Sequence, residues 1–337
     1  MIPWRKTESA QGGPSDAKRL LVIQLGGVTA FVQALAAARA IRDAHIGAHI
    51  TLLTTETNRA LAEKAPYFDK VEADGKPKEP QAITKLIARI RAAKYDVIYD
   101  LEGSNRTANY FQGLRPWPPR WSGPVAGASH AFSGAEDLHP LDRYAAQLAA
   151  AGLVANDALM PDLSWVRPVM RDAPRMLPDY FGLRGRYVLL LPRGSDLDPN
   201  RRWPQEKYLD LAKRLARNGV TPVVLGGPEE RPVGAYIAKE EPRAKNLVTR
   251  PDLFQCAALA ERAVFAVGDD VDLMHVAAAA GAPCLAFLSS LSSPDQAAPR
   301  GRGGVITLTA AVIADLPVEQ VERQVRNCGV FQHAATA

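Results

Sequence analysis

Three arginines gather on one short segment that is also rich in glycine, proline and aspartate. Arg193, Arg201 and Arg202 follow an apolar run at 187–191 and precede a helical pattern. A guanidinium group binds phosphate oxygens through paired hydrogen bonds, so three of them on one loop favour a phosphate clamp over ordinary surface charge. Ser195 in the same segment would add a hydroxyl donor.

A second place for a phosphate is the start of a short alanine-rich helix. The run 263–267 is apolar and bounded by glycine, which is typical of a buried strand, and 284–288 is a second strand after a helix over 273–280. The free N–H groups and the positive dipole at the start of such a helix suit a phosphate or pyrophosphate. Three aspartates are expected to supply turn and N-cap oxygens there: Asp269, Asp270 and Asp272.

Other polar and aromatic residues allow two interpretations each. Asp270 and His275 stand five positions apart, and the residues by themselves favour an N-cap aspartate with a packed histidine over a ligand-binding pair. Glu102 near Arg106 is typical of a salt bridge at a helix start, a common feature of protein surfaces. Trp203 is more typical of a packing anchor than of a stacking surface.

These residues are expected at the ends of strands in an α/β protein. Apolar strands alternate with amphipathic helices along most of the chain, which predicts parallel sheets covered on both faces. In the first half the expected strands are 19–25, 48–53, 68–72 and 95–101, and the expected helices are 31–41, 83–93 and 142–152. In the second half the expected strands are 187–191, 220–225, 247–248, 263–267, 284–288 and 305–308, and the expected helices are 204–218, 229–240, 253–261, 273–280 and 318–326.

Composition along the chain predicts the domain boundaries. Residues 1–18 are polar and lack the apolar stretch of a signal peptide, so we expect a flexible tail. We expect a doubly wound domain over 19–160, a proline-bearing linker over 161–185 and a second doubly wound domain over 186–337. The stretch 113–139 is rich in Pro, Gly and Trp without a sustained period, so we expect it to be functional or ordered by packing.

The overall composition argues against several classes of protein. Of the 337 residues, 47% are hydrophobic and 23% are charged, which is ordinary for a globular chain. The net charge of +5 is scattered, which indicates a solvated surface or attraction to an anionic substrate or membrane face, and no basic stripe with interleaved aromatics predicts a nucleic-acid partner. Cys256 and Cys284 lie in apolar segments and are expected to be inert, and no Cys/His spacing predicts a metal site. No apolar run is long enough to span a membrane, so a cytoplasmic protein is expected.

Four stretches, in this order along the chain, resemble motifs of the bacterial heptosyltransferase family. The last, DVDLMHVAAAAGAP, is similar to the family's Asp-Ser-Gly-x-Met-His-x-Ala-Ala-Ala-x-Gly-x-Pro. The resemblance implies the GT-B fold, in which two Rossmann-like domains face a cleft. It also implies that a sugar is transferred with inversion to lipopolysaccharide core or a related envelope glycan. The expected sugar is heptose, and the expected donor is ADP-heptose. The four stretches are Asp100–Thr107, His139–Tyr144, Pro192–Glu206 and Asp270–Pro283.

The resemblance also implies which residues bind each substrate. It implies no cofactor and no metal, and it is compatible with peripheral contact on the cytoplasmic face of the inner membrane. Gly226 and Gly227 with Glu229 and Glu230 are read equally as a tight turn or as the place of an acid near the adenosine. The implied donor-binding residues are Arg193, Gly194, Ser195, Arg201, Gly226, Glu229, Asp270, Leu273, Met274 and His275. The implied acceptor-binding residues are Gly26, Gly27, Val28 and Arg106.

The chain departs from the family pattern where the chemistry is expected. Gly27 stands where the family has the aspartate that is taken to remove the proton of the acceptor hydroxyl. Loss of a general base typically lowers a rate by about 10²–10⁴-fold. Either another acid serves, with Glu102 and Asp100 as the main candidates and Asp196 as a third, or the protein binds a nucleotide sugar or a partner enzyme without transfer. A further possibility is another acceptor, with Trp117 and Trp121 contacting sugar or lipid.

Overall fold

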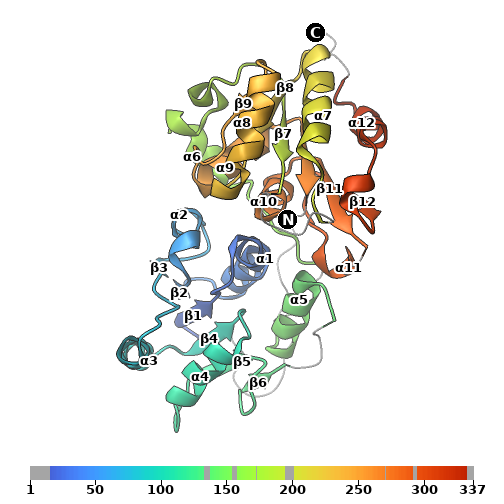
Figure 1. Ribbon diagram of the computed structural model, residues 1–337. Coiled ribbons are helices and arrows are strands. Elements are labelled where there is room, and N and C mark those ends of the chain that lie inside the picture. Colours follow the sequence, from blue (N-terminus) through green and yellow to red (C-terminus); the bar gives the residue numbers. More distant parts are fainter. Residues whose placement is uncertain are drawn as a thin grey trace. The chain divides into compact units, whose positions relative to one another are not determined.

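The computed structural model describes residues 16–132, 137–153, 158–171, 173–193, 201–269, 271–290 and 294–331. The chain divides into two compact units, Met1–Pro161 and Asp162–Ala337 (Figure 1). Each unit contains a six-stranded sheet with helices around it. The α/β class and the two doubly wound sheets that the sequence predicts are therefore confirmed.

Unit 1 contains a parallel sheet in the strand order β3-β2-β1-β4-β5-β6. Its central strand reads RLLVI and is buried after the first residue, as expected for a strand covered on both faces. The strands are β1 (Arg19–Ile23), β2 (His49–Leu53), β3 (Lys70–Glu72), β4 (Val97–Asp100), β5 (Arg120–Gly123) and β6 (His130–Ala131). The helices are α1 (Val28–Ala44), η2 (Glu56–Asn58), α2 (Arg59–Ala62), α3 (Pro80–Ala93), α4 (Asn105–Gly113) and α5 (Pro140–Ala150).

Unit 2 repeats this architecture in the strand order β12-β11-β10-β7-β8-β9. The strands are β7 (Tyr187–Leu191), β8 (Thr221–Val224), β9 (Lys245–Asn246), β10 (Phe265–Asp269), β11 (Cys284–Ser289) and β12 (Val305–Ala310). The longer helices are α6 (Val166–Arg171), α7 (Gln205–Arg217), α8 (Arg231–Glu240), α9 (Leu253–Arg262), α10 (Asp272–Ala280) and α12 (Val318–Asn327). The short ones are η3 (Pro174–Met176), η4 (Pro178–Phe181), η6 (Pro228–Glu230), α11 (Pro294–Ala297) and η7 (Ile313–Asp315).

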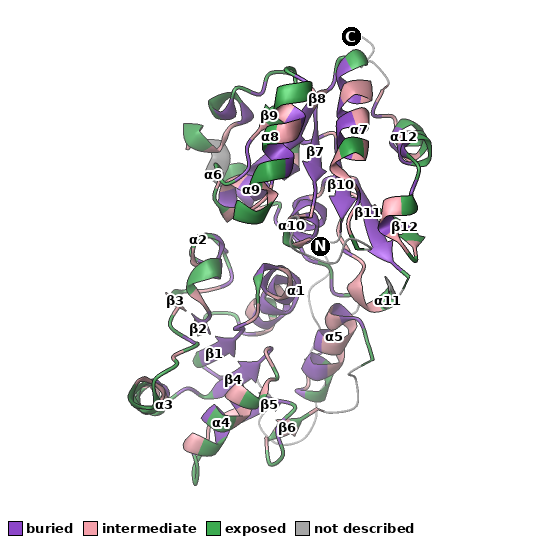
Figure 2. Ribbon diagram, in the orientation of Figure 1, coloured by how far each residue is buried: buried purple, intermediate pink, exposed green. Residues whose placement is uncertain are grey.

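Helix packing follows the apolar pattern of each helix. In α7 the buried positions recur at helical spacing and form the face towards the core of unit 2, while the remaining positions are half-buried or exposed (Figure 2). The buried positions are Tyr208, Leu209, Leu211, Ala212, Leu215 and Ala216. In α10 every residue from Met274 to Ala280 is buried, because small alanine side chains let the helix lie close to its neighbours.

The local structure adds detail to the sequence-based expectations in three places. The stretch 113–139 was expected to be functional or ordered by packing, and it contains two strands that were not predicted, β5 and β6. Those strands were missed because β5 reads RWSG, with one large apolar residue, Trp121, which is fully buried against Phe111. The connection 161–185 contains α6, η3 and η4, which pack against α9. The weak strand expected at 247–248 lies two residues earlier, as β9.

The strand order reverses beside the first strand of each sheet. In unit 1 the chain moves from β1 to β2 on one side and later returns to pair β4 with β1. In unit 2, β7 lies between β8 and β10 in the same way. Ligands of open α/β sheets bind at the carboxyl ends of the strands at such a reversal. The two places to search are therefore the ends of β1 and β4 and the ends of β7 and β10.

Candidate functional site

In unit 1, two glycines form the turn that joins β1 to α1. A Cβ on Gly26 would lie 2.7 Å from the Cβ of Ala30, so this position has no room for a side chain. A Cβ on Gly27 would have no atom within 4 Å, and its φ of −66° is one that any residue adopts. The position that lacks the expected carboxylate is therefore open to one.

Glu102, which follows β4, places its carboxylate beside this turn. Its Oε2 accepts the backbone N–H of Leu25 at 3.0 Å and lies 3.5 Å from the position that a Cβ would take on Gly26. The residue is half-buried. The structure thus brings the predicted Glu102 beside Leu25 and Gly26, across the reversal between β1 and β4, whereas none of its atoms lies within 4 Å of the Cβ position of Gly27.

Asp100 ends β4 and is buried, with 1% of its surface exposed. Its Oδ1 accepts the backbone N–H of Gly103 at 2.9 Å, and Ser104 and Thr107 then form a capping box that starts α4. Burial raises the pKa of Asp100 to about 6, and the hydrogen bond from Gly103 opposes that rise. The Asp100 carboxyl therefore shapes the turn that carries Glu102.

Residues that the sequence did not single out support the same turn. Gln24 is buried; its Oε1 accepts the N–H of Gly26 at 2.6 Å, and its Nε2 donates to the Tyr144 hydroxyl at 3.1 Å. Asn58 is also buried and its Nδ2 donates to the Gly26 carbonyl at 3.0 Å. Tyr144 lies within the quoted HPLDRY stretch, but its contact with Gln24 depends on the packing of α5 and could not be predicted.

The remaining acceptor-side predictions lie at the same edge of unit 1. Val28 is buried at the start of α1, and the half-buried Arg106 donates from Nη1 to the Pro77 carbonyl at 2.8 Å. Trp121 is buried and so contacts no sugar or lipid, contrary to that possibility, whereas Trp117 is 89% exposed.

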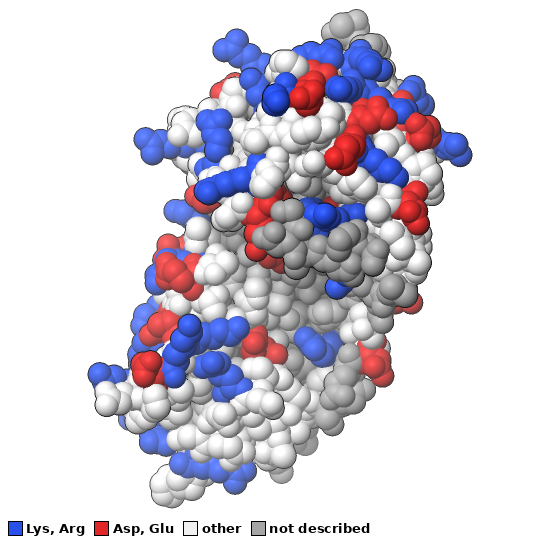
Figure 3. Space-filling view, in the orientation of Figure 1, with Lys and Arg blue, Asp and Glu red and all other residues white. Residues whose placement is uncertain are grey.

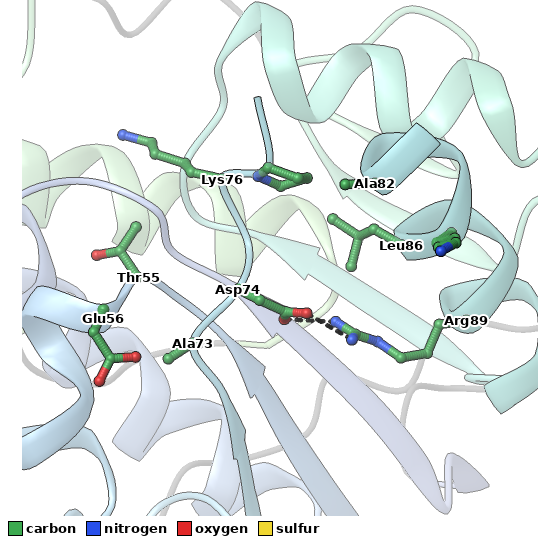
Figure 4. A pocket seen from close by; sticks show the side chains of 10 residues that line it. Thr55, Glu56, Ala73, Asp74, Lys76, Ala82, Leu86 and Arg89 are labelled. Atoms are coloured by element: carbon green, nitrogen blue, oxygen red, sulfur yellow. Dashed lines mark hydrogen bonds and ion pairs between the residues drawn. The ribbon is translucent and has the colours of Figure 1, made fainter. Parts of the chain in front are cut away.

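A pocket of about 650 Å³ lies in unit 1 beside the ends of β2 and β3. Figure 4 shows Arg89 pointing at Asp74, with two hydrogen bonds of 2.6 and 2.7 Å. No carboxylate in the described part of the chain pairs with Lys76 or Lys85, so the pocket carries uncompensated positive charge. The lining residues are Thr55, Glu56, Ala73, Asp74, Lys76, Pro77, Ala82, Lys85, Leu86 and Arg89.

In unit 2, a buried carboxylate joins the ends of the arginine segment. Asp269 is 0% exposed; its Oδ2 accepts the N–H of Arg193 at 3.0 Å and its Oδ1 accepts the N–H of Trp203 at 2.9 Å. The Tyr208 hydroxyl donates to Oδ2 at 3.0 Å. Burial raises the pKa of Asp269 to about 7, and these hydrogen bonds oppose the rise.

The expected cap of the alanine-rich helix is therefore wrong for Asp269. The carboxyl belongs to the last residue of β10 and turns towards β7, and the N-cap of α10 is Val271, which offers no side-chain hydrogen bond. The first turn of α10 also contains the exposed Asp272, whose negative charge opposes an anion at this helix end. Asp270, Gly194 and Ser195 lie outside the described residues, so their predicted roles remain predictions.

The other donor-side predictions lie around the ends of β7, β8 and β10. Arg193 is half-buried and Arg201 is exposed, while Met274 and His275 are buried in α10 and Leu273 is half-buried. Trp203 is the predicted packing anchor: it is 2% exposed and its Nε1 donates to the Leu316 carbonyl at 2.9 Å.

The two-glycine turn after β8 is held by Glu230. The Glu230 Oε2 accepts the N–H of Gly227 at 2.6 Å, and the Gly226 carbonyl accepts the N–H of Thr249 at 2.9 Å. Glu229, which the sequence places near an adenosine, is exposed at this edge. Of the two acids, one therefore shapes the turn and the other faces solvent.

Several findings bear on the metal, cysteine and partner predictions. Within the described ranges no group of three His, Cys, Asp or Glu residues is arranged to hold a metal ion, and no helix is long and apolar enough to cross a membrane. Cys256 and Cys284 are buried, and burial raises the pKa of each thiol to about 12, as expected for inert thiols. On the face shown in Figure 3, basic and acidic residues interleave over both units.

Comparisons with known proteins agree with this architecture. Residues 83–308 match the family model of glycosyltransferase family 9 (heptosyltransferase). The chain is 27% identical over 234 residues to lipopolysaccharide heptosyltransferase 2 of Escherichia coli, a match that covers 64% of this chain and 65%, just under two thirds, of that relative.

Solved structures share the fold over almost the whole chain. A family 9 glycosyltransferase from Veillonella parvula has a TM-score of 0.78 at 19% identity, covering 94% of this chain and 98% of that one. An Escherichia coli heptosyltransferase bound to ADP-2-deoxy-2-fluoro heptose has a TM-score of 0.72 at 17% identity. The match covers 92% of this chain and 99% of that one. The GT-B fold is thus confirmed, and the chain belongs to glycosyltransferase family 9, the heptosyltransferase family.

Proposed function

We propose that this protein transfers heptose from ADP-heptose to a sugar of the lipopolysaccharide core or a related envelope glycan, with inversion at the anomeric carbon. The observation that carries the proposal is the family match over residues 83–308, because it spans the Glu102 turn, the arginine segment and the β10–α10 unit. The ligand of the related Escherichia coli structure, ADP-2-deoxy-2-fluoro heptose, supports the choice of donor.

Unit 2 holds the donor in this proposal. Arg193 and Arg201 bind the diphosphate with Ser195, and the N-terminus of α10 faces the same charge. Asp270 accepts hydrogen bonds from the sugar hydroxyls. Gly226 and Glu229 lie on the adenosine side. No metal is needed in this scheme, because the guanidinium groups and helix N–H groups stabilise the negative charge that develops on the departing ADP.

Unit 1 holds the acceptor and supplies the base. The Glu102 carboxylate removes the proton of the acceptor hydroxyl, that oxygen bonds to the anomeric carbon, and the bond from this carbon to the diphosphate oxygen breaks. Glu102 is favoured over Asp100, because Asp100 is 1% exposed and its carboxyl is occupied by the turn. Arg106 and the uncompensated Lys76 and Lys85 suit an acceptor that carries phosphate or carboxylate groups.

The decisive experiment measures ADP released from ADP-heptose with and without acceptor. The parent protein should release ADP only when acceptor is present. Glu102→Gln should lower kcat by about 10²–10⁴-fold while the protein stays folded, because the glutamine oxygen can still accept the N–H of Leu25. Equal turnover by parent and Glu102→Gln would contradict the assignment of the base.

A second candidate function is binding of the nucleotide sugar without transfer. The open space at Gly27 favours it, since the expected carboxylate is missing where it would fit. In that case the parent binds ADP-heptose without turnover, and Gly27→Asp creates turnover. Gly27→Asn is the matched control, since it fills the same space without a basic carboxylate and should remain inactive.

We also propose peripheral contact with an anionic membrane, where a lipid-linked acceptor is found. The net charge of +5 supports it, as does Trp117, which is 89% exposed and lies two positions after the exposed Arg115 in the sequence. The protein should float with vesicles that contain anionic lipid and not with neutral ones. Trp117→Ala should reduce that flotation, and equal flotation with both kinds of vesicle would contradict the proposal.

A further inference from the structure

The carboxylate of Asp269 is a buried polar group of unit 2 with several hydrogen-bond donors around it. It is 0% exposed, and it accepts hydrogen bonds from two backbone N–H groups and one hydroxyl, at 3.0, 2.9 and 3.0 Å. A buried carboxylate without such partners would be strongly unfavourable, so its partners indicate what it holds. They belong to Arg193, Trp203 and Tyr208.

The first two partners lie at opposite ends of the arginine segment. Arg193 is the second residue after β7, and Trp203, ten positions later, is the second residue before α7. The Asp269 carboxylate accepts hydrogen bonds from the N–H groups of both Arg193 and Trp203. The two ends of the segment are therefore held close together. Arg201 lies two residues before the second attachment point.

The surrounding packing fixes the carboxylate itself. Gly268 pairs with Leu191, and a Cβ on Gly268 would lie 2.2 Å from the Leu191 carbonyl oxygen, so only glycine lets β10 lie this close to the end of β7. The Asp269 N–H donates to the Tyr208 hydroxyl at 3.1 Å. The Trp203 ring packs against Tyr208 and Phe287, with centroid distances of 4.8 and 5.1 Å.

We propose that Asp269 is a positioning residue for the donor diphosphate. Its carboxylate holds the backbone N–H groups of Arg193 and Trp203, at the two ends of the segment that bears Arg193 and Arg201. In this way it sets the spacing of the two guanidinium groups that bind phosphate. This inference rests on the proposed function. It adds a residue that touches no substrate and acts through the two arginines.

The test compares ADP binding by calorimetry among three variants. Asp269→Ala should weaken ADP binding by about tenfold or more, because misplaced binding groups lose affinity steeply. Asp269→Asn keeps one acceptor oxygen and should fall between Asp269→Ala and the parent. Tyr208→Phe keeps both backbone attachments and should bind ADP within about twofold of the parent. If the Asp269→Ala protein does not fold, the comparison of Asp269→Asn with the parent still tests the proposal.

A double-mutant cycle separates positioning from general stability. If Asp269 acts through the arginines, Asp269→Ala should weaken ADP binding much less in an Arg201→Ala background than in the parent. The KM for the acceptor should stay within about twofold in the single variant. Full additivity of the two changes, or parental ADP affinity in a folded Asp269→Ala protein, would overturn the inference.

Hydrogen exchange tests the attachment without any substrate. The amides of Arg193 and Trp203 should exchange faster in Asp269→Asn or Asp269→Ala than in the parent, while amides within β7 keep their protection. Parental exchange at both amides would overturn the inference by itself. Failure of the parent to bind either ADP or ADP-heptose would instead contradict the proposed function, so the two ideas fail through different observations.

Discussion

Two aspartates occupy equivalent places in the two units but hold different parts of the chain. Asp100 ends β4 beside β1, and Asp269 ends β10 beside β7; both are buried, and burial raises their pKa values to about 6 and about 7. Asp100 accepts the N–H of Gly103 in its own turn, whereas Asp269 accepts N–H groups of the segment after the neighbouring strand.

In the proposed function, this difference lets one architecture bind two substrates. In unit 1 a locally closed turn presents one acid, Glu102, to a compact two-glycine turn. In unit 2 the same strand position ties down a longer segment that carries basic residues. A carboxylate suits proton removal from a neutral hydroxyl, and guanidinium groups suit a diphosphate, so the proposed acceptor and donor sides follow from what each aspartate holds.

The largest expected effect separates the two units by substrate. Arg201→Ala should lower kcat/KM for the donor by about 10²–10³-fold, because a group that meets developing charge on the diphosphate is lost. Arg106→Ala in unit 1 should instead raise the acceptor KM and leave ADP affinity unchanged. Steady-state kinetics with each substrate varied would check both. An Arg106→Ala protein with weaker ADP binding would break the division.

The raised pKa values predict a pH effect of a few kcal/mol at most. A carboxyl with a raised pKa in the folded state stays protonated while the unfolded chain has already ionised, so its contribution to stability is lost as pH rises. For Asp269 the loss runs from pH 3.8 to about 7, and for Asp100 from pH 3.8 to about 6. Each pKa unit corresponds to about 1.4 kcal/mol.

Denaturant unfolding at several pH values would measure this effect. The free energy of unfolding of the parent minus that of Asp269→Asn should fall between pH 3.8 and about 7. The difference for Asp100→Asn should level off at lower pH, near 6. Difference curves that stay flat over this range would show that burial does not control these carboxyls.

The two neighbouring glycines of unit 1 should respond differently to a methyl group. Gly26→Ala should destabilise the protein by about 1–3 kcal/mol, because its Cβ would lie 2.7 Å from that of Ala30. Gly27→Ala should change the free energy of unfolding by less than about 0.5 kcal/mol, because no atom lies within 4 Å of its Cβ position. Thermal unfolding would compare the two variants. Equal destabilisation would mean that the space around the Cβ position of Gly27 is not open.

The smallest expected effect concerns divalent metal. Since arginines neutralise the diphosphate in the proposed scheme, treatment with EDTA should leave the rate of ADP release within about twofold of the untreated rate. A rate that collapses with EDTA and recovers on addition of Mg²⁺ would show that the arginines of unit 2 do not suffice.

The sequence predicts most of the fold because the strands are strongly apolar. The run at 187–191 and the helix spacing around Tyr208 leave little choice of structure, and both were placed correctly. β5 escaped prediction because Arg120 and Ser122 flank a single buried tryptophan, and its place in the sheet depends on pairing with β4. Short strands of mixed composition are defined by their neighbours more than by their residues.

The candidate site was predictable only as a set of residues near strand ends. Glu102 was named from sequence, and its position beside the two glycines came from the pairing of β1 with β4. Asp269 was misassigned as a cap, because its true contacts depend on the register of β10 against β7 and on Gly268. Three aspartates stand close together in this stretch, and only the tertiary register shows that Asp269 faces inward.

A crystal structure with ADP-2-deoxy-2-fluoro heptose and an acceptor sugar would test the central claim most directly. The diphosphate is expected on Arg193 and Arg201 before the start of α10, with Glu102 as the carboxylate nearest to the acceptor hydroxyl. A diphosphate bound away from both arginines, or an acceptor hydroxyl with Glu102 out of hydrogen-bonding reach, would contradict it.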